Sequence, residues 1–206
     1  MTENDRQTEE KIFKAATEVF IEKGLDGSRM QDIADRAGMN KSLLHYYYRT
    51  KDRLFNAVFD MIAGQMFKRF AMVFDEHYTL EEKIKFFLKE HITFLQKNPR
   101  LPSFFLNEIN RNPAIIKKFL EHVDVGKIWT TIESQHKEEL KNYHITRDDI
   151  PQLMTSIVAM SVFPFAARAL LSGIMGKMGF DFDDYIEKRK EYAGEFVVNA
   201  IKKHSR

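Results

Sequence analysis

The sequence predicts an all-α protein, and three observations predict it. Apolar residues recur at helical spacing through most of the chain, and strand-like alternation is scarce. No Asn-Gly or Asp-Gly turn is flanked by alternating strands. Glycine (9) and proline (5) are few among 206 residues, whereas phenylalanine (18) and methionine (10) are many, which suits long helices with adaptable packing.

We expect the first helix to begin near Thr8, whose side chain can cap it, and to stop at Gly24. Glu9 and Glu10 would stand in its first turn, where acidic side chains are favourable. The residues of its core-facing stripe follow the spacing i, i+3, i+4, i+7, i+8. They are Ile12, Ala15, Ala16, Val19 and Phe20.

Two short helices are predicted next. Residues 28–31 form a capping-box pattern that opens a helix to about Arg36, and Ala37, Gly38 and Met39 form a tight turn. Asn40 can cap a second helix over about 41–47. Neither helix is long enough to persist alone, so both must pack on the first helix.

The rest of the chain predicts a larger helical region. Thr50 caps a long helix over 51 to about 77, and a capping box at 79–82 opens another that ends before Asn98. Asn98-Pro99 and Asn112-Pro113 both resemble a cap followed by Pro at the first helical position. Further helices are expected around residue 129, over 148–173 and over 183–203, with a glycine-containing loop at 173–179. We therefore divide the chain into residues 1–50 and 51–206.

Two short helices joined by a three-residue turn containing Gly38 form the helix-turn-helix pattern. Positive charge gathers there. Residues 28–53 carry six basic and three acidic side chains, whereas residues 1–27 carry four basic and seven acidic ones. The pattern favours DNA binding, and the alternative is an ordinary two-helix turn with a solvated basic face.

Residues 28–54, SRMQDIADRAGMNKSLLHYYYRTKDRL, together with the amphipathic first helix and Gly24, resemble the TetR family of transcriptional repressors. The resemblance covers about a quarter of the chain. It implies a three-helix DNA-binding domain followed by a domain of six or so helices for ligand binding and dimerisation. In this family the last two helices usually pair with a second subunit, and the middle helices enclose a ligand pocket.

The resemblance also implies roles for single residues. Base edges would be read by Lys41 and Ser42, with Gln31 as a further groove contact, and phosphates would be met by His45, Tyr47 and Lys51. The full expected DNA-binding set is Ser28, Arg29, Gln31, Lys41, Ser42, Leu43, His45, Tyr46, Tyr47 and Lys51. Leu43 and Tyr46 would offer apolar contact to thymine methyl groups.

Some of these residues have a second interpretation, and some depart from the family pattern. Gln31 is also expected to complete the capping box, and Tyr46 or Tyr47 to pack on the first helix. Arg36 is expected to be a solvated or paired charge. His45 stands where the family usually has Tyr, so protonation would strengthen phosphate contact and DNA affinity would fall with rising pH. The N-terminal segment is acidic, with only Arg6 as a basic residue before Lys11, unlike a minor-groove arm.

Aromatic and thioether side chains on the later helices are expected to line an apolar cavity for a hydrophobic or aromatic effector, although core packing would give the same pattern. Arg168 ends an uncharged run and could meet an acidic ligand group or a carboxylate across a subunit seam. The expected ligand-binding set is Phe87, His91, Phe94, Phe104, Phe105, Asn107, Glu108, Trp129, Met160, Phe163 and Arg168.

Composition and motifs narrow the class of protein further. Cysteine is absent, which excludes disulfides and thiolate metal sites, and a net charge of +2 implies no polyanion partner by itself. We expect no signal peptide and a cytoplasmic location. The uncharged run 150–167 is expected to be a buried helix in a bundle or dimer seam rather than a membrane span. No phosphate loop, zinc-protease motif or nucleophile elbow occurs, so we expect no enzyme, no cofactor and no metal site.

The sequence thus predicts a homodimeric regulator, by family expectation a repressor, that a small effector releases from a pseudo-palindromic operator. Effector binding would move the helix that begins at residue 51 and so change the separation of the two recognition helices. The alternatives are a DNA-binding protein controlled by a protein partner, and a purely structural helical dimer.

Overall fold

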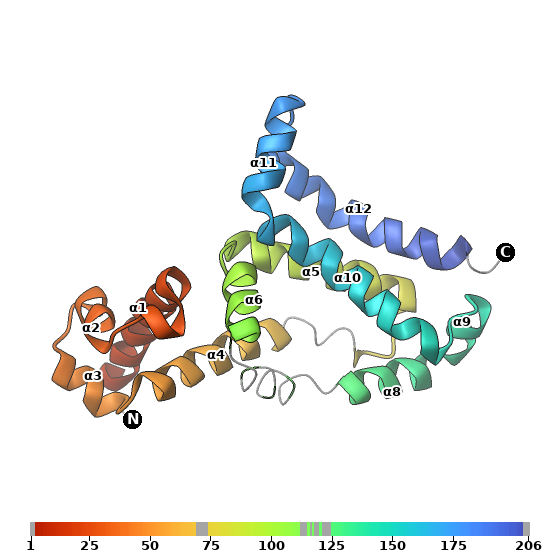
Figure 1. The fold of residues 1–206 in the computed structure, drawn as a ribbon. Coiled ribbons are helices and arrows are strands. Elements are labelled where there is room, and N and C mark those ends of the chain that lie inside the picture. The colour runs from red at the N-terminus through yellow and green to blue at the C-terminus, as the bar shows by residue number, and fades with distance from the viewer. Residues whose placement is uncertain are drawn as a thin grey trace. The chain divides into compact units, whose positions relative to one another are not determined.

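The computed structural model describes residues 3–68, 74–111 and 125–203, together with residues 115, 117 and 120. Every element in these residues is helical, which confirms the all-α prediction (Figure 1). The elements are α1 (Glu3–Gly27), α2 (Met30–Ala37), α3 (Lys41–Tyr47), α4 (Lys51–Lys68), α5 (Leu80–Lys97), α6 (Leu101–Arg111), α8 (Val125–Gln135), α9 (Lys137–Asn142), η2 (Arg147–Asp149), α10 (Ile150–Ala166), α11 (Arg168–Lys177) and α12 (Phe182–Lys203).

The chain forms two compact units. The first is Met1–Gln65 with Phe104–Ile116, and the second is Met66–Ser103 with Lys117–Arg206. The first unit therefore extends beyond residues 1–50. The rings of Phe55 and Phe104 lie 6.0 Å apart and those of Phe59 and Phe105 lie 5.0 Å apart, so the second half of α6 packs on α4.

The first unit is built around the predicted stripe of α1. Ile12, Ala16 and Phe20 are fully buried, as are Ile33 of α2 and Leu44 of α3. Each fully buried aliphatic side chain contributes about 1.5–3 kcal/mol relative to leaving it in water. These contacts hold two helices that are too short to persist alone.

Local backbone signals shape the helix-turn-helix. The Asn40 side chain accepts a hydrogen bond from the Leu43 amide at 2.7 Å and caps α3. Gly38 ends α2 in the left-handed conformation, with φ of 66°, which a side chain would disfavour. The Thr50 hydroxyl accepts from the Arg53 amide at the start of α4. These three predicted signals are confirmed.

Two predicted boundaries in this unit are wrong. Helix α1 begins at Glu3 and not at Thr8, because the acidic N-terminal residues continue the helix. Helix α2 begins at Met30 with Arg29 before it, and the Arg29 amide donates to Asp32 Oδ2, so the box at 28–31 does not form. The predicted stop at Gly24 is confirmed as a break with φ of 69°, although a last helical turn follows it.

In the second unit α5 packs along α12, and α10 lies against both (Figure 1). Helix α12 buries Ile186, Val197 and Ile201, and most of its packing is against α5. Gly194 allows a close approach, because a Cβ there would lie 3.0 Å from Lys85 Cα. The predicted capping box at Thr79 and Glu82 opens α5 as expected.

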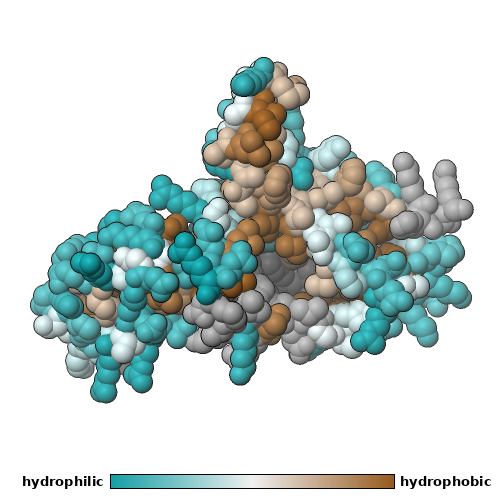
Figure 2. Space-filling view, viewed as in Figure 1, coloured by the Kyte–Doolittle hydropathy of each residue, from teal (hydrophilic) through white to brown (hydrophobic). Residues whose placement is uncertain are grey.

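Helix α11 projects away from α5 and α10, and Figure 2 shows hydrophobic residues along it. None of its ten residues is buried. Leu170, Ile174 and Met178 recur at i, i+4, i+8 and are 61%, 47% and 64% exposed. A helix of this length with no buried residue is marginal in isolation.

The later part of the chain also departs from prediction in four places. Residues 75–79 are not helical, so the helix from residue 51 does not reach 77. Helix α6 begins at Leu101 rather than Pro99, because Asn98 ends α5. The helix predicted over 148–173 is broken at Ala167 into α10 and α11, and the glycines 173 and 176 lie inside α11 rather than in a loop. The expected start at Asn112-Pro113 lies outside the described residues.

Among the described residues, one helical stretch, Arg147–Ala166, is long and apolar enough to cross a membrane. Only 17% of its apolar window is buried within the chain, so of the two expected surroundings, a bundle or a dimer seam, the low burial favours the seam, which stays a prediction. An exposed apolar helix is also what an interface between subunits presents in a single protomer.

Candidate DNA-binding and effector-binding residues

The outer face of α3 carries most of the predicted base-reading residues. Lys41 and Ser42 in its first turn are exposed, Leu43 is 38% exposed and Tyr46 is 80% exposed. Leu44, between them, is fully buried and fixes which face of the helix points inward. The first turn of a recognition helix is the part that meets base edges in the major groove.

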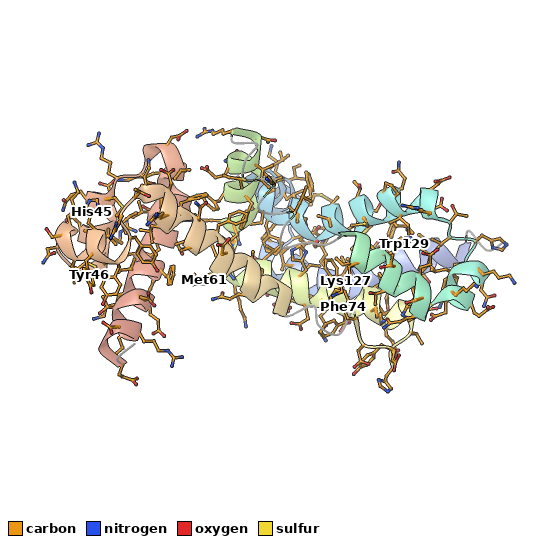
Figure 3. The ribbon with its side chains drawn as sticks, turned by 90° about the horizontal axis from the view of Figure 1, so that it is seen from below. His45, Tyr46, Met61, Phe74, Lys127 and Trp129 are labelled. Carbon is orange, nitrogen blue, oxygen red and sulfur yellow. The ribbon has the colours of Figure 1, made fainter. Side chains whose placement is uncertain are left out.

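His45 and Tyr46 are neighbours on this helix (Figure 3). His45 Nδ1 lies 3.2 Å from the Arg49 carbonyl oxygen. A carbonyl only accepts, so Nδ1 carries the proton. Nε2 is then an acceptor in the neutral ring and a donor only after protonation.

Tyr47 faces inward, unlike Tyr46. Its hydroxyl donates to Asp5 Oδ1 of α1 at 3.0 Å. Burial is the larger cause and this acidic partner the second cause of a raised pKa of the phenol. The ring of Tyr48 meets Phe13 edge-on at 5.8 Å. Of the two expected tyrosines, only Tyr46 is presented outward.

Ser28 is the residue that the structure removes from the expected DNA-binding surface. It is 2% exposed, and its hydroxyl lies within hydrogen-bond distance of the Val19 and Gly24 carbonyl oxygens of α1. Lys51 is also engaged, since its Nζ donates to the carbonyl oxygens of Asp26 (3.3 Å) and Ser28 (3.0 Å). These two residues fix the loop between α1 and α2.

The polar side chains on and beside α2 differ in whether they are exposed or engaged by other residues of the chain. Arg29 and Gln31 are exposed, but Gln31 Nε2 donates to Asp35 Oδ1 at 2.7 Å instead of completing a capping box. Arg36 pairs with Glu22 at 2.9 Å and Glu18 at 3.1 Å, as expected for a paired charge, and these carboxylates raise its pKa. Its charge is directed toward α1.

The eleven expected effector-binding residues divide between the two units. Phe104, Phe105, Asn107 and Glu108 lie in the first, and the other seven lie in the second. Phe104 is 6% exposed and belongs to the core with Phe55. Glu108 is 4% exposed, and its Oε1 accepts from the Leu25 amide at 3.0 Å, whereas Asn107 is exposed.

His91 joins α5 to α10 inside the second unit. Its Nδ1 lies 2.9 Å from the Ser161 hydroxyl, which is within donating distance of the carbonyl oxygens of Ile157 and Val158 on its own helix. Because the hydroxyl proton goes to a carbonyl, His91 Nδ1 is the donor in this pair. Burial lowers the pKa of His91 to about 4, so the ring is neutral at pH 7.

Five further members of the set lie on three helices, α5, α8 and α10. Phe87 contacts the His91 ring at 5.4 Å, and Phe94 is buried beside it on α5. Trp129 of α8 (Figure 3) and Met160 of α10 are half-buried, whereas Phe163 is 55% exposed. These placements mix core positions with surface positions.

Arg168 contacts two residues of its own chain. Its Nη2 lies 3.0 Å from Asp183 Oδ1, and its guanidinium stands 4.7 Å from the centre of the Phe182 ring. Both partners begin α12, so Arg168 joins the start of α11 to the start of α12.

Sequence reasoning missed a buried lysine. Lys83 is 2% exposed, its Nζ donates to Gln135 Oε1 at 2.6 Å, and burial lowers its pKa. The sequence does place this lysine on an apolar helix face. By helical spacing that face is shared by Leu80, Lys83, Phe87 and His91. Among the described residues no group of three acidic or histidine side chains is placed to hold a metal ion.

Comparison with known proteins agrees with this arrangement. Residues 12–58 match the family of bacterial regulatory proteins of the tetR family. The repressor NicS of Pseudomonas putida is 36% identical over 27% of this chain and 26% of its own length. The fatty acid metabolism regulator of Bacillus subtilis is 28% identical over 56% of this chain and 59% of its own. The chain thus aligns with less than two thirds of either relative.

The fold of most of the chain is also found in solved structures. The regulator FadR of Bacillus subtilis, in complex with stearoyl-CoA, superposes with a TM-score of 0.61. The sequences are 20% identical, and the match covers 89% of this chain and 96% of that one. The match to the tetR family model spans residues 12–58, which hold the helix-turn-helix, and the likeness to the solved structure shows that the all-helical fold is shared.

Proposed function

We propose that the chain is a homodimeric, effector-responsive repressor that acts in the cytoplasm on a pseudo-palindromic operator and catalyses no reaction. Residues 1–50 would form the DNA-binding domain, and 51–206 the effector-binding and dimerisation domain. The observation that carries the proposal is the outer face of α3, where Lys41, Ser42, Leu43 and Tyr46 are exposed directly after a capped turn. Lys41 and Ser42 would read base edges, and Arg29, Gln31 and His45 would flank them.

The variant Lys41→Ala is expected to bind the operator about 10- to 100-fold more weakly, since one good base contact contributes about 1–3 kcal/mol. The operator would first be obtained by selection from random DNA, and the dissociation constant measured by fluorescence anisotropy over a salt series. Arg36→Ala is the matched control. It removes the same charge from the same unit, but its guanidinium faces Glu18 and Glu22.

Selection that enriches no sequence would contradict the regulator proposal. Equal affinities of Lys41→Ala and wild type for an enriched site would instead remove α3 as the reading element. A helical dimer with a structural role predicts the first result and not the second.

The proposed dimer would use the last helices. Nine of the fifteen exposed large hydrophobic side chains that the structure describes lie between residues 154 and 196. At roughly 200 Å² for a large side chain, their exposed fractions amount to on the order of 900 Å². A stable interface needs about 800 Å² per partner. The nine exposed side chains counted above are Met154, Val158, Phe163, Leu170, Ile174, Met178, Phe180, Tyr192 and Phe196.

We propose a hydrophobic effector, and the likeness to the fatty acid regulator supports a long acyl chain as the first ligand to test. Stearoyl-CoA is expected to raise the dissociation constant of the operator complex by at least about tenfold, because an effector acts only by binding the DNA-incompetent state better. Trp129 is the only tryptophan, so its fluorescence reports on α8 in the same titration. Coenzyme A without the acyl chain is the control.

An operator complex that persists with stearoyl-CoA and with a panel of planar aromatic compounds would contradict a small hydrophobic effector. That result would favour the alternative, a helix-turn-helix protein controlled by a protein partner. The buried side chains of Leu88, Ile92 and Phe94 are the observation that this alternative would use, since a filled core leaves less room for a ligand.

A further inference from the structure

A buried carboxylate joins α6 to the end of α1. Glu108 is 4% exposed, and its Oε1 accepts a hydrogen bond from the Leu25 amide at 3.0 Å. A buried carboxylate is costly unless it is hydrogen-bonded or paired, so the loss of this contact would be felt. Helix α6 begins at Leu101 within the second unit and ends at Arg111 within the first.

The receiving backbone is shaped for this contact. Gly24 has a φ of 69°, which ends the regular part of α1. A Cβ at Gly24 would lie 2.8 Å from Glu108 Oε1 and 3.8 Å from Arg111 Nη1. Glycine therefore serves the positive φ and also leaves the space that the carboxylate occupies.

The contact continues into the helix-turn-helix. The Ser28 hydroxyl lies within hydrogen-bond distance of the Gly24 carbonyl oxygen, and Lys51 Nζ donates to the Ser28 carbonyl oxygen at 3.0 Å. Ser28 lies two residues before α2, and Lys51 is the first residue of α4. One chain of hydrogen bonds thus runs from α6 through the end of α1 to the starts of α2 and α4.

We propose that Glu108 is the positioning residue through which α6 and the helix-turn-helix respond to each other. A shift of α6 would move the Leu25 amide with the carboxylate, and Ser28 and Lys51 would carry that shift to α2 and α4. The proposal rests on the proposed function, because it assumes that DNA binding and the second unit are coupled. Coupling is reciprocal, so DNA bound at α3 must in turn alter α6.

This reciprocity allows a test that needs no effector. Hydrogen–deuterium exchange in residues 101–111 would be measured with and without the selected DNA site. In the wild type we expect DNA to change the exchange rate by at least about fivefold, which is the smallest effect usual for coupling between two binding sites. Glu108→Gln should keep this response, since an amide oxygen can still accept from Leu25. Glu108→Ala should reduce it to less than about twofold while still binding DNA.

Leu106→Ala is the control on the same helix, because Leu106 is 46% exposed and lies outside the expected effector-binding set. If Glu108→Ala fails to fold by circular dichroism, Glu108→Asp takes its place, since it keeps the charge but is one methylene too short to reach the amide. A full exchange response in the Glu108 variant, or no response in DNA-bound wild type, would overturn the proposal for Glu108 and leave the proposed function standing. A wild type that binds no DNA would overturn the proposed function, and this proposal with it.

Discussion

We expect the variant Phe196→Asp to be a monomer at concentrations where the wild type forms the proposed dimer. Phe196 is 49% exposed on α12, and its ring lies 6.1 Å from that of Tyr192. A carboxylate brought into an apolar interface is left without a partner, and desolvating it costs several kcal/mol. Sedimentation velocity at low micromolar concentration would measure the change in mass.

The same variant should bind a two-half-site operator on the order of 100-fold more weakly, because each monomer then holds one half-site without the gain from linkage. Its affinity for a single half-site should stay that of the wild type. Leu106→Asp is the matched control, since Leu106 is 46% exposed but lies on α6. A dimeric Phe196→Asp would contradict pairing through α12.

Helix α11 can be examined with the same design. Ile174→Asp places a carboxylate in the stripe formed with Leu170 and Met178. Dissociation of this variant would extend the interface to α11, whereas an intact dimer would confine it to α10 and α12. The helix has no buried residue within the chain, so the first result is the one we expect.

The second large effect concerns His91 and acid stability. We expect the free energy of unfolding to fall by about 2 kcal/mol between pH 7 and pH 5 on account of this residue alone. Its pKa in the folded protein is about 4, against an ordinary 6.5 for an unfolded histidine. Between these values the unfolded chain binds a proton that the folded chain does not. The contribution of neutral His91 to the free energy of unfolding is therefore fully present above pH 6.5 and is lost as the pH falls toward 4.

Urea unfolding of the wild type and His91→Asn at both pH values would measure this effect. The asparagine amide can still donate to the Ser161 hydroxyl, but it does not titrate. The variant should therefore lose about 2 kcal/mol less than the wild type over the same range. Other histidines and carboxylates contribute equally to both proteins, so identical pH slopes would show that His91 is not the cause.

The features that the sequence predicted well are local ones. The caps at Asn40, Thr50 and Thr79 and the glycine turn at Gly38 were all found, because each depends on residues within four positions of one another. The buried face of α1 was also predicted, since 3.6-residue periodicity fixes it without knowledge of its partners. The exposed face of α3 then follows from Leu44 being buried.

The features that could not be predicted depend on distant contacts. Glu108 was expected to face a ligand, yet it binds an amide 83 residues earlier in the chain, and no local pattern specifies that partner. Ser28 was expected at the DNA, yet its hydroxyl turns back to α1. The break at Ala167 lies three residues after Pro164, so the apolar run did contain a helix-breaking residue, although a proline does not by itself fix where a helix ends.

The engagement of Arg36 and Lys51 by groups of their own chain bears on how such a protein would find its operator. Both belong to the basic segment 28–53, yet one is held by two carboxylates of α1 and the other by two backbone carbonyl oxygens. Attraction to DNA of any sequence grows with the number of cations that reach phosphates. With these two charges engaged by groups of their own chain, the protein would leave unrelated chromosomal DNA sooner during its search, and residence at the operator would depend more on the fit of α3 to its bases.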